Sequence, residues 1–270
     1  MRRLVIRPGG IGDCIVALPA MESLRAEFTE VWVPSPVVPL IRFADRVRAI
    51  PATGIDLLGL PSVEPELGLI DHLRTFDSIV SWYGSNRPEF RQTATELGLP
   101  FEFLQALPGA TSRVHSADFF LGQVGRGPGG LPRIDCGTVQ RGDGAVIHPF
   151  SGSARKNWPL QRYRELAERL PARVQWCAGP EEDLAEAVRM DDLYQLACWL
   201  ASARIYIGND SGITHLAAAV GAPVIAIFGP TDPNVWAPRG ERVRVVHANL
   251  EDIQVNEVLK VARVYFRFMR

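Results

Sequence analysis

The sequence predicts an α/β protein built from two domains, each with a parallel β-sheet. Short apolar runs of strand length alternate with segments of helical periodicity in both halves of the chain, which is typical of parallel sheets covered by helices. Residues 122–144 hold eight glycines and two prolines and separate the halves. The 270 residues, of which 47% are hydrophobic and 22% charged, are enough for two cores of ordinary size.

The first domain, which we place at residues 1–135, contains three apolar runs of strand length. Residues 4–6 form the first run, and a glycine-rich turn and a helical pattern follow it. Pro19 lies inside that pattern and is expected to kink or divide the helix, because proline lacks the N–H that a helix interior needs. Residues 31–33 and 76–82 form the other two runs.

The second domain, at residues 136–250, alternates strands and helices more regularly. One helix is expected to begin near Trp158, and another near Glu181. A third is capped by Asp192, and a fourth ends at Gly221. The expected strands in and just before this domain are residues 133–136, 145–148, 174–178, 204–207 and 224–228. Parallel α/β sheets bind ligands at the carboxyl ends of their strands, so the polar loops there are the first candidates for a site.

Composition and charge exclude several classes of protein. The net charge of -1 at pH 7 argues against a general nucleic-acid binder. No apolar run approaches the roughly 18 residues needed to cross a bilayer, and the N-terminal apolar run is too short for a signal peptide. The four cysteines are scattered without Cys-x-x-Cys spacing, which indicates neither a zinc site nor a disulfide framework. These features predict a reduced, cytoplasmic protein.

The strongest functional signal is residues 209–215, Asn-Asp-Ser-Gly-Ile-Thr-His, which follow a strand and open a helix. Free backbone N–H groups and the helix dipole at such a point favour an anion, a diphosphate above all. The glycine allows the backbone to approach closely, and the serine and threonine add hydroxyl donors. The alternative is that Asp210 or Ser211 only caps the helix and that His215 packs in the core.

A second loop with similar chemistry spans residues 149–157. Ser151, Ser153 and Lys156 are expected to converge on a helix N-terminus, which predicts another anion site with Lys156 as its point charge. The loop lacks the Gly-x4-Gly-Lys-Ser/Thr pattern of a P-loop, and an exposed basic turn is the alternative. All lysine and arginine positions except Lys156 and Lys260 hold arginine. The lysine at position 156 indicates either that the site needs a compact ammonium group or that its occurrence there is chance.

The glycine-rich turn at residues 9–13, Gly-Gly-Ile-Gly-Asp, joins the first strand to the first helix. Dinucleotide binding is disfavoured, because the Gly-x-Gly-x-x-Gly pattern is absent and Val33, at the end of the second strand, is followed by proline instead of an acid. Asp13 places a carboxylate at the mouth of the first domain, where it can act as a general base. The alternative role for Asp13 is that of a helix N-cap.

Three blocks of sequence carry a resemblance to a known family: Gly12-Asp13 followed by Pro19, residues 148–159, and residues 210–233. They resemble glycosyltransferase family 9, the family of ADP-heptose:lipopolysaccharide heptosyltransferases. The resemblance implies a GT-B fold, in which two Rossmann-like domains face a cleft. It also implies an inverting, metal-independent transfer of heptose from ADP-heptose to a lipopolysaccharide-type or other glycan acceptor, without a cofactor.

The resemblance also assigns roles to residues of this chain, which looks like a shortened member of the family. Asp13 stands at the position of the catalytic base, with Gly10 and Gly12 on the acceptor side. The resemblance implies that Glu181 or Glu182 binds the ribose of the nucleotide, and the sequence does not distinguish between the two. The implied donor residues are Ser151, Ser153, Lys156, Ser211, Gly212, Ile213 and Thr214 for the phosphates, and Asp210 and His215 for the sugar.

The C-terminal stretch, residues 251–270, is expected to form a helix that packs back onto the first domain. Helical spacing places Lys260, Arg263, Arg267 and Arg270 on one face. That basic edge predicts, as an alternative, peripheral contact with anionic lipids at the inner face of the inner membrane.

Two other functions stay open. A non-catalytic sugar-nucleotide binder would keep the phosphate loops, although the presence of Asp13 argues for catalysis. A nicotinamide-dependent oxidoreductase is disfavoured by the missing ribose acid. The expected partners are a nucleotide-sugar donor and a glycan or glycolipid acceptor, and no nucleic acid.

Overall fold

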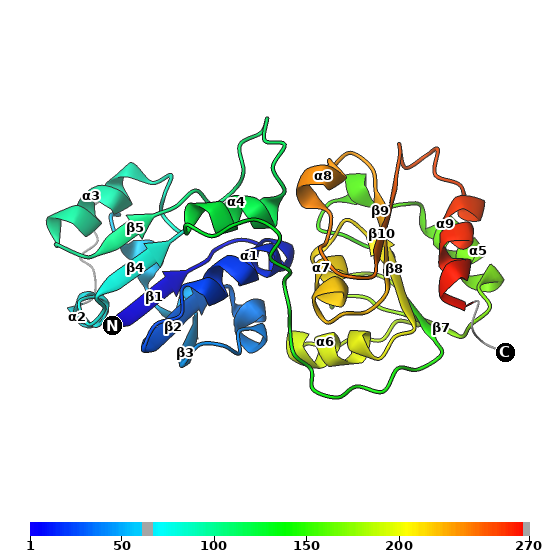
Figure 1. Cartoon of the computed structure of the whole chain (residues 1–270), viewed down its shortest axis with the longest axis horizontal. Helices are drawn as coiled ribbons and strands as arrows, with labels where there is room; N and C mark the ends of the chain where they lie inside the picture. The colour runs from blue at the N-terminus through cyan, green and yellow to red at the C-terminus, as the bar shows by residue number, and fades with distance from the viewer. Residues whose placement is uncertain (61–66, 267–270) are drawn as a thin grey trace. The chain divides into compact units, whose positions relative to one another are not determined.

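The structure is a computed structural model that describes residues 1–60 and 67–266 (Figure 1). The chain divides into two compact units: Met1–Ser112 with Ser116–Gly130, and Arg113–His115 with the residues from Leu131 onward. The main division, between Gly130 and Leu131, falls inside the glycine-rich segment 122–144. Each unit contains one parallel sheet with helices, so the predicted fold class is confirmed.

The first sheet consists of β1 (Arg2–Ile6), β2 (Phe28–Val33), β3 (Arg46–Ala49), β4 (Ser78–Ser81) and β5 (Phe101–Phe103). Its order is β3-β2-β1-β4-β5, and every neighbouring pair is parallel. The chain winds from β1 to one edge and then returns to β4 on the other side of β1. Ligand sites in such sheets lie at the carboxyl ends of the strands where the order reverses, which here are β1 and β4.

The helices of the first unit are α1 (Ile11–Ser23), α2 (Leu67–Leu73), α3 (Pro88–Glu96) and α4 (Ser116–Gln123), with short 3-10 turns at Ser35–Leu40, Ile50–Ala52 and Ile55–Leu57. Helix α1 continues through Pro19, so the helix is not divided there. Proline removes one hydrogen bond, whereas the residues between Cys14 and Met21 are nearly all buried, and their packing holds the helix together.

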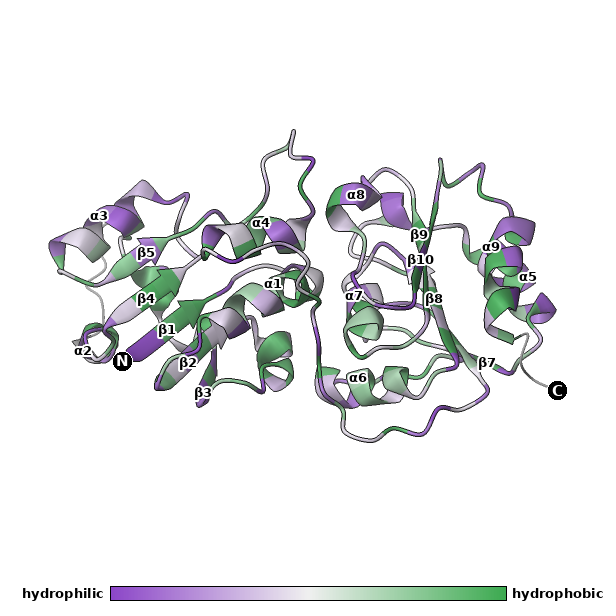
Figure 2. Cartoon of the chain, viewed as in Figure 1, coloured by the Kyte–Doolittle hydropathy of each residue, from purple (hydrophilic) through white to green (hydrophobic). Residues whose placement is uncertain are grey.

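The second sheet consists of β6 (Ala145–His148), β7 (Val174–Trp176), β8 (Ile205–Asn209), β9 (Val224–Phe228) and β10 (Val243–His247). Its order is β10-β9-β8-β6-β7, again parallel throughout. The order reverses between β6 and β8. Figure 2 shows hydrophobic residues along the strands of both sheets and hydrophilic residues on the outward sides of helices such as α3.

The helices of the second unit are α5 (Leu160–Arg169), α6 (Leu193–Ala201), α7 (Gly212–Ala219), α8 (Pro233–Trp236) and α9 (Val255–Arg263), with 3-10 turns η4 (Ala154–Lys156) and η5 (Val264–Phe266). The strand predicted at residues 133–136 and the helix predicted from Glu181 are absent. Residues after β7 instead form turns, and Val188 returns to pair with Cys177 in a parallel bridge.

Helix α9 packs within the second unit, and the expectation that residues 251–270 also pack back onto the first domain stays a prediction. Val258, Leu259 and Ala262 on its apolar face share a core with Trp158 and Tyr163. That core covers the apolar face of α9 within its own unit. The terminal positions of the predicted basic edge, Arg267 and Arg270, lie outside the described residues. Among the described helices, none is both long enough and apolar enough to cross a membrane.

Candidate functional site

Asn209 joins the two loops that follow β6 and β8, the strands at which the second sheet reverses its order. Asn209 ends β8 and is fully buried. Its Oδ1 accepts hydrogen bonds from the N–H of Trp158 at 3.0 Å and from the hydroxyl of Tyr163 at 2.8 Å. Its Nδ2 donates to the carbonyl oxygen of Pro149 at 2.8 Å. Asn209 thus fixes the loop after β6, a role that the sequence analysis did not assign to it. The signal that could have revealed this role is a polar amide side chain at the end of an apolar strand.

The ammonium of Lys156 contacts the carboxylate of Asp210, with Nζ 2.8 Å from Oδ2. The Asp210 side chain is 8% exposed and that of Lys156 is 35% exposed, so the carboxylate is the more buried partner. Two predicted site residues are thereby brought together. However, α5 begins at Leu160, and Lys156 lies in the turn η4 before it. The role of this loop as an anion site before the start of α5 stays a prediction.

The hydroxyls of Ser211 and Thr214 serve the fold at the start of α7. Ser211 is the N-cap, and its Oγ accepts a hydrogen bond from the N–H of Thr214 at 3.3 Å. The Thr214 hydroxyl donates to the carbonyl oxygen of Asn209 and lies 3.1 Å from the hydroxyl of Tyr206. Thr214 is fully buried, which contradicts the expectation that its hydroxyl donates to a phosphate. The capping alternative holds for Ser211.

Backbone groups at the same helix start fit an anion better than these hydroxyls do. Gly212 and Ile213 form the first turn of α7 and are partly exposed. The first N–H groups of a helix have no partner inside the helix, and the positive end of its dipole lies there. His215, one turn further, is 6% exposed, so its side chain is largely enclosed by the protein. The amides of Gly212 and Ile213 are thus the groups of this loop whose geometry suits an anion.

The loop that carries Lys156 is shaped by its own serines. Ser151 Oγ lies 2.8 Å from the carbonyl oxygen of Ser153 and 2.7 Å from Oδ1 of Asn157. The N–H of Ser153 also donates to Ser151 Oγ, at 3.3 Å. The Ser151 hydroxyl is therefore used inside the loop, where it holds Ser153 and Asn157 on either side of the turn η4.

Glu182 and Glu181, which the sequence does not distinguish, have different surroundings. Glu182 Oε2 accepts hydrogen bonds from the N–H of Gly179 at 2.6 Å and from Nε2 of the buried His148 at 3.0 Å. Burial acts to raise the pKa of Glu182, but the contacts with His148, Gly179 and Arg189 together hold that pKa below its ordinary value. Glu181 is exposed. Glu182 is therefore the carboxylate built into the site beside β6.

In the first unit, Asp13 occupies the third position of α1. Its Oδ2 accepts a hydrogen bond from the N–H of the N-cap residue, Gly10, at 2.8 Å. Gly9 has a φ of +114°, and a Cβ on it would lie 2.8 Å from Cβ of Asp13. Gly12 lies in the first turn and is partly exposed, as is Asp13. Asp13 thus closes the first helical turn without being the N-cap itself, and its carboxylate is still reachable.

Arg7, directly after β1, supports Asp13 and was not singled out from the sequence. It is 1% exposed. Its Nε and Nη2 donate to the carbonyl oxygen of Asp13 at 3.3 and 3.0 Å, and its Nη1 donates to that of Ala106 at 2.9 Å. The guanidinium carbon lies 4.4 Å from the centre of the Phe120 ring. Burial lowers the pKa of Arg7. The sequence signal that could have singled out Arg7 is its position as a basic residue between an apolar strand and a glycine-rich turn.

Comparison with known proteins shows which family the second unit resembles. Residues 139–262 match the model of glycosyltransferase family 9 (heptosyltransferase). Lipopolysaccharide heptosyltransferase 1 of Escherichia coli (strain K12) is 31% identical over 127 residues, which are 42% of this chain and 40% of the relative. Residues 139–262 thus resemble the heptosyltransferases of glycosyltransferase family 9. The same enzyme of Pseudomonas aeruginosa is 34% identical over 100 residues, 32% of this chain and 28% of the relative. The matched region thus spans two fifths or less of these relatives.

Solved structures extend the family 9 comparison to the fold of the whole chain. A family 9 glycosyl transferase from Veillonella parvula aligns with a TM-score of 0.76 at 16% identity, covering 98% of this chain and 96% of that one. The Escherichia coli heptosyltransferase WaaC with ADP aligns with a TM-score of 0.71 at 19% identity, covering 98% and 100%. At such identities the likeness shows the fold alone, and that fold is GT-B, as predicted.

Proposed function

We propose that this chain is an inverting glycosyltransferase that moves a heptose or a related sugar from a nucleotide diphosphate sugar, ADP-heptose in the first instance, to a glycan acceptor of the lipopolysaccharide type. The observation that carries the proposal is the Lys156–Asp210 pair beside the N-terminus of α7, where the second sheet reverses its order. Relatives named as lipopolysaccharide heptosyltransferases support the sugar and the acceptor, and a solved relative with ADP supports the nucleotide.

The donor would be held mainly by the second unit. An ammonium has three N–H donors, so Lys156 can bind a phosphate oxygen and keep its contact with Asp210. The amides of Gly212 and Ile213 add donors at the positive end of the α7 dipole. We assign Asp210 to the hydroxyls of the donor sugar and Glu182 to those of the ribose, because both are carboxylates fixed near strand ends.

The transfer would form a bond between an acceptor oxygen and the anomeric carbon and break the bond from that carbon to the diphosphate. Attack opposite the leaving group inverts the configuration. Asp13 would take the proton of the acceptor hydroxyl, and Lys156 with the α7 amides would stabilise the charge on the leaving diphosphate. Since protein groups meet that charge, we expect full turnover in EDTA. Loss of turnover in EDTA that Mg²⁺ restores would contradict this part.

The Asp13→Asn variant tests the base. Asparagine keeps an oxygen that can accept the N–H of Gly10, so we expect the thermal midpoint and the donor affinity to stay near those of the wild type. Release of ADP in the presence of acceptor is expected to fall by at least about 10², the scale of general-base assistance. Turnover near the wild-type value would remove Asp13 from the mechanism.

The Lys156→Ala variant tests the phosphate site, with Arg155→Ala as its matched control. We expect Lys156→Ala to weaken ADP binding by about 1.5–3 kcal/mol, the scale of a charge-assisted hydrogen bond. Arg155 is exposed and carries the same charge one residue away, so its removal is expected to change ADP affinity by less than about 1 kcal/mol. Lys156→Arg is also expected to be impaired, because a planar fork does not replace a point charge. If the two alanine variants weaken ADP binding equally, ADP responds only to the net positive charge of the loop, and Lys156 has no specific contact with it.

A non-catalytic sugar-nucleotide binder is the second candidate, because the Asp13 carboxylate already has a structural role at the start of α1. Thermal shift with ADP and release of ADP from a donor with acceptor separate the two functions. Stabilisation by ADP without turnover on any glycan acceptor would favour the binder.

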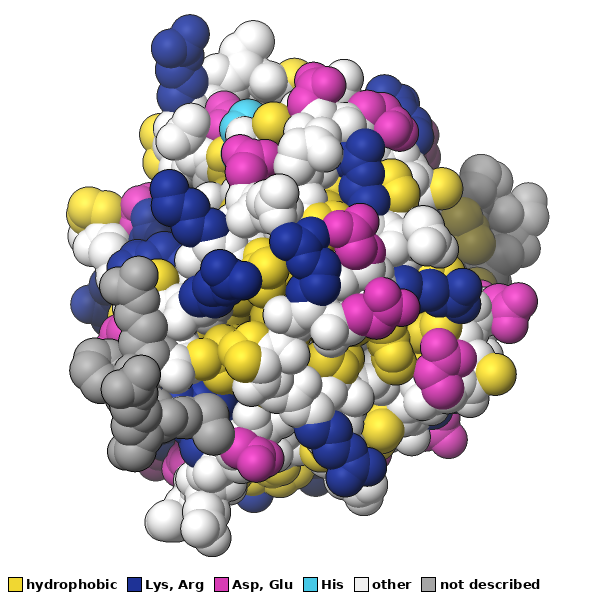
Figure 3. Space-filling view, turned by 90° about the vertical axis from the view of Figure 1, so that its right-hand side faces the viewer, with side chains coloured by type: hydrophobic (Ala, Val, Ile, Leu, Met, Phe, Trp, Pro, Cys, Tyr) yellow, Lys and Arg dark blue, Asp and Glu magenta, His cyan; other side chains and the backbone are white. Residues whose placement is uncertain are grey.

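Peripheral contact with an anionic membrane surface also remains a proposal. Lys260 and Arg263 are exposed on α9. Figure 3 looks onto the side of the second unit that carries α9 and shows Lys and Arg side chains interspersed with Asp and Glu. Flotation with phosphatidylglycerol vesicles is the test: co-flotation that the Lys260→Glu, Arg263→Glu double variant loses supports contact, and no co-flotation refutes it.

A further inference from the structure

His148 and Glu182 form a pair whose histidine is more buried than its carboxylate. His148 ends β6, and its side chain is 3% exposed, whereas the side chain of Glu182 is 26% exposed. Nε2 of His148 lies 3.0 Å from Oε2 of Glu182. A carboxylate accepts hydrogen bonds and does not donate them, so the hydrogen of this bond is on Nε2. The buried ring is therefore a donor to a side chain that a ligand can reach.

The other ring nitrogen of His148 has different surroundings. Nδ1 is buried and has no hydrogen-bond partner among the residues that the structure describes. A hydrogen on Nδ1 would therefore be a buried N–H without a partner, which costs free energy. The neutral ring with its one hydrogen on Nε2 avoids that cost. The surroundings of the ring thus favour the tautomer that donates to Glu182.

The same oxygen of Glu182 receives a second hydrogen bond from the backbone. The N–H of Gly179 donates to Oε2 at 2.6 Å. A Cβ on Gly179 would lie 3.5 Å from Cδ of Glu182, so the backbone passes the carboxylate in van der Waals contact. Among the described residues, no hydrogen bond reaches Oε1 of Glu182. Two donors thus fix one oxygen, and the other oxygen keeps its lone pairs for a ligand.

A second histidine–glutamate pair, in the first unit, has the opposite arrangement. Nε2 of His72 lies 3.1 Å from Oε1 of Glu30, but there the carboxylate is fully buried and the histidine side chain is 21% exposed. The indole N–H of Trp32 donates to the same oxygen at 2.7 Å. Since neither oxygen of Glu30 is open to a ligand, we assign that pair to the fold. The partly exposed carboxylate distinguishes the pair of His148 and Glu182.

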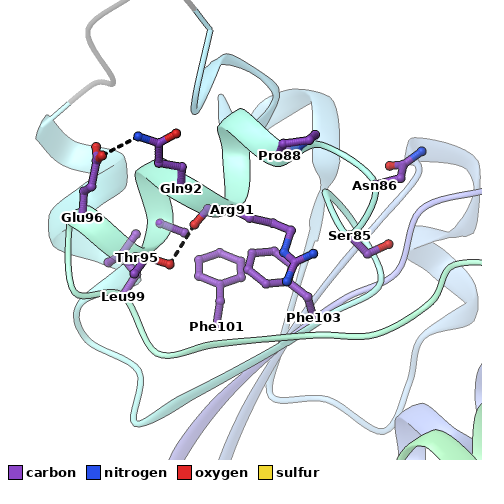
Figure 4. Close-up of a pocket in the computed structure, with 11 residues that line it drawn as sticks. Ser85, Asn86, Pro88, Arg91, Gln92, Thr95, Glu96, Leu99, Phe101 and Phe103 are labelled. Atoms are coloured by element: carbon purple, nitrogen blue, oxygen red, sulfur yellow. Dashed lines mark hydrogen bonds between the residues drawn. The ribbon is translucent and has the colours of Figure 1, made fainter.

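On α3 and α5, exposed carboxylates have their donors on the same helix. Glu96 accepts a hydrogen bond from Gln92, four residues earlier, and Figure 4 shows that bond beside a pocket of the first unit. Glu165 pairs with Arg169 in the same way. Glu182 instead is held by a residue 34 positions earlier, at the end of an interior strand of the sheet. The position of Glu182 is thus set by the sheet as well as by its own turn.

We propose that His148 is a positioning residue, which holds Glu182 so that Oε1 accepts hydrogen bonds from the ribose hydroxyls of the donor nucleotide. The inference rests on the proposed function, in which Glu182 binds that ribose. Adjacent hydroxyls of a ribose can both donate to one carboxylate, and an acceptor that is already fixed loses less conformational freedom on binding than a mobile one. His148 itself touches no ligand and acts only through Glu182.

The affinities of the full chain for two nucleotides test the ribose contact without turnover. ADP and 2′,3′-dideoxy-ADP share the base and the diphosphate and differ only in the two ribose hydroxyls. In isothermal titration calorimetry we expect the wild type to bind ADP at least about 10-fold more tightly than the dideoxy nucleotide, the scale of one charge-assisted hydrogen bond. The affinity for the dideoxy nucleotide reports the contacts that do not involve those hydroxyls.

Three variants of His148 separate its hydrogen bond from its packing. His148→Leu removes the donor and keeps an apolar side chain, and we expect the preference for ADP to fall below about 3-fold. His148→Gln places an amide N–H near the position of Nε2 and is expected to restore most of the preference. His148→Asn is too short to reach Glu182 and is expected to behave as His148→Leu. Each variant should bind 2′,3′-dideoxy-ADP within about 2-fold of the wild type, which shows that the site is folded.

The His72→Leu variant is the matched control, because it breaks the other histidine–glutamate pair. We expect it to lower the thermal midpoint, since the buried carboxylate of Glu30 loses a partner. The preference for ADP over 2′,3′-dideoxy-ADP is expected to stay at the wild-type value, because His72 lies in the first unit and Glu182 in the second.

A wild type that binds both nucleotides equally, or a His148→Leu variant that keeps the full preference for ADP, would overturn the role of His148. A His148→Gln variant no better than His148→Leu would do the same, because packing alone would then explain the loss. Failure of the transferase proposal gives a different result: the preference for ADP persists, but no glycan acceptor yields turnover. Binding of neither nucleotide would contradict the donor site itself and this inference with it.

Discussion

Replacement of Asn209 by alanine would remove the side chain that holds the Lys156 loop against the end of β8. The truncation leaves three buried groups without their partner: the N–H of Trp158, the hydroxyl of Tyr163 and the carbonyl oxygen of Pro149. Asn209, Trp158 and Tyr163 are each at most 1% exposed, so bulk water does not replace the lost contacts.

The magnitude follows from those three groups. Each buried donor or acceptor that loses its partner costs about 1–3 kcal/mol, and some relaxation is expected, so the sum is about 3–6 kcal/mol. The Tyr163→Phe variant removes one of these bonds and leaves Asn209 Oδ1 with the N–H of Trp158. It is expected to cost only about 1 kcal/mol.

Urea unfolding and hydrogen exchange of the full-length variants provide the assay. Asn209→Ala is expected to lose protection in α5 and β8 while the amides of α1 and β1 keep theirs, since the lost bonds all lie in the second unit. ADP affinity should fall in parallel, because the loop of Lys156 is no longer fixed. If Asn209→Ala costs no more than Tyr163→Phe, the bond network does not position the loop and the reasoning is refuted.

Three other predictions follow from single residues. The pKa of Glu182 is held below its ordinary value of 4.5, so its ionised form stabilises the fold above that pH. Glu182→Gln should therefore be less stable than the wild type at pH 7, and the difference should shrink as the pH falls below 4.5; a constant difference in thermal midpoint would contradict this. Gly9→Ala should cost more stability and turnover than Gly54→Ala, because both glycines have positive φ but only Gly9 has a side chain against it. If the two variants lower the free energy of unfolding equally, the close contact between Gly9 and Asp13 does not contribute to the effect. Burial raises the pKa of the Cys14 and Cys177 thiols to about 12, so a thiol reagent at pH 8 should leave both unlabelled until the protein unfolds, as peptide mass spectrometry can check.

The sequence predicted best the strands that are buried on both faces. Residues 145–148 and 224–228 match β6 and β9, because a parallel strand covered by helices is a continuous apolar run with clear ends. The edge strands β3 and β10 were missed because they have only four and five residues, too few for the alternation of arginine and valine, which is typical of a half-buried strand, to stand out.

For the candidate site, strand ends located the loops, but not the partners of their hydroxyls. The pairing of Lys156 with Asp210 depends on the adjacency of β6 and β8, which lie far apart in the sequence. Thr214 faces inward because its hydroxyl contacts Tyr206 and the carbonyl oxygen of Asn209. These partners are near in sequence, but only the turn from β8 into α7 brings them to the hydroxyl. Glu182 was separable from Glu181 only through its contact with His148.

The contacts of Arg7 have a consequence for how the first unit opens. One guanidinium ties the carbonyl oxygen of Asp13 to that of Ala106, a residue in the segment after β5, and rests on Phe120 of α4. The turn that carries the proposed base therefore cannot fray by itself, because its release also frees the far edge of the sheet and a helix. The amides of this turn are therefore expected to exchange more slowly than those of glycine-rich loops that lack such a tie.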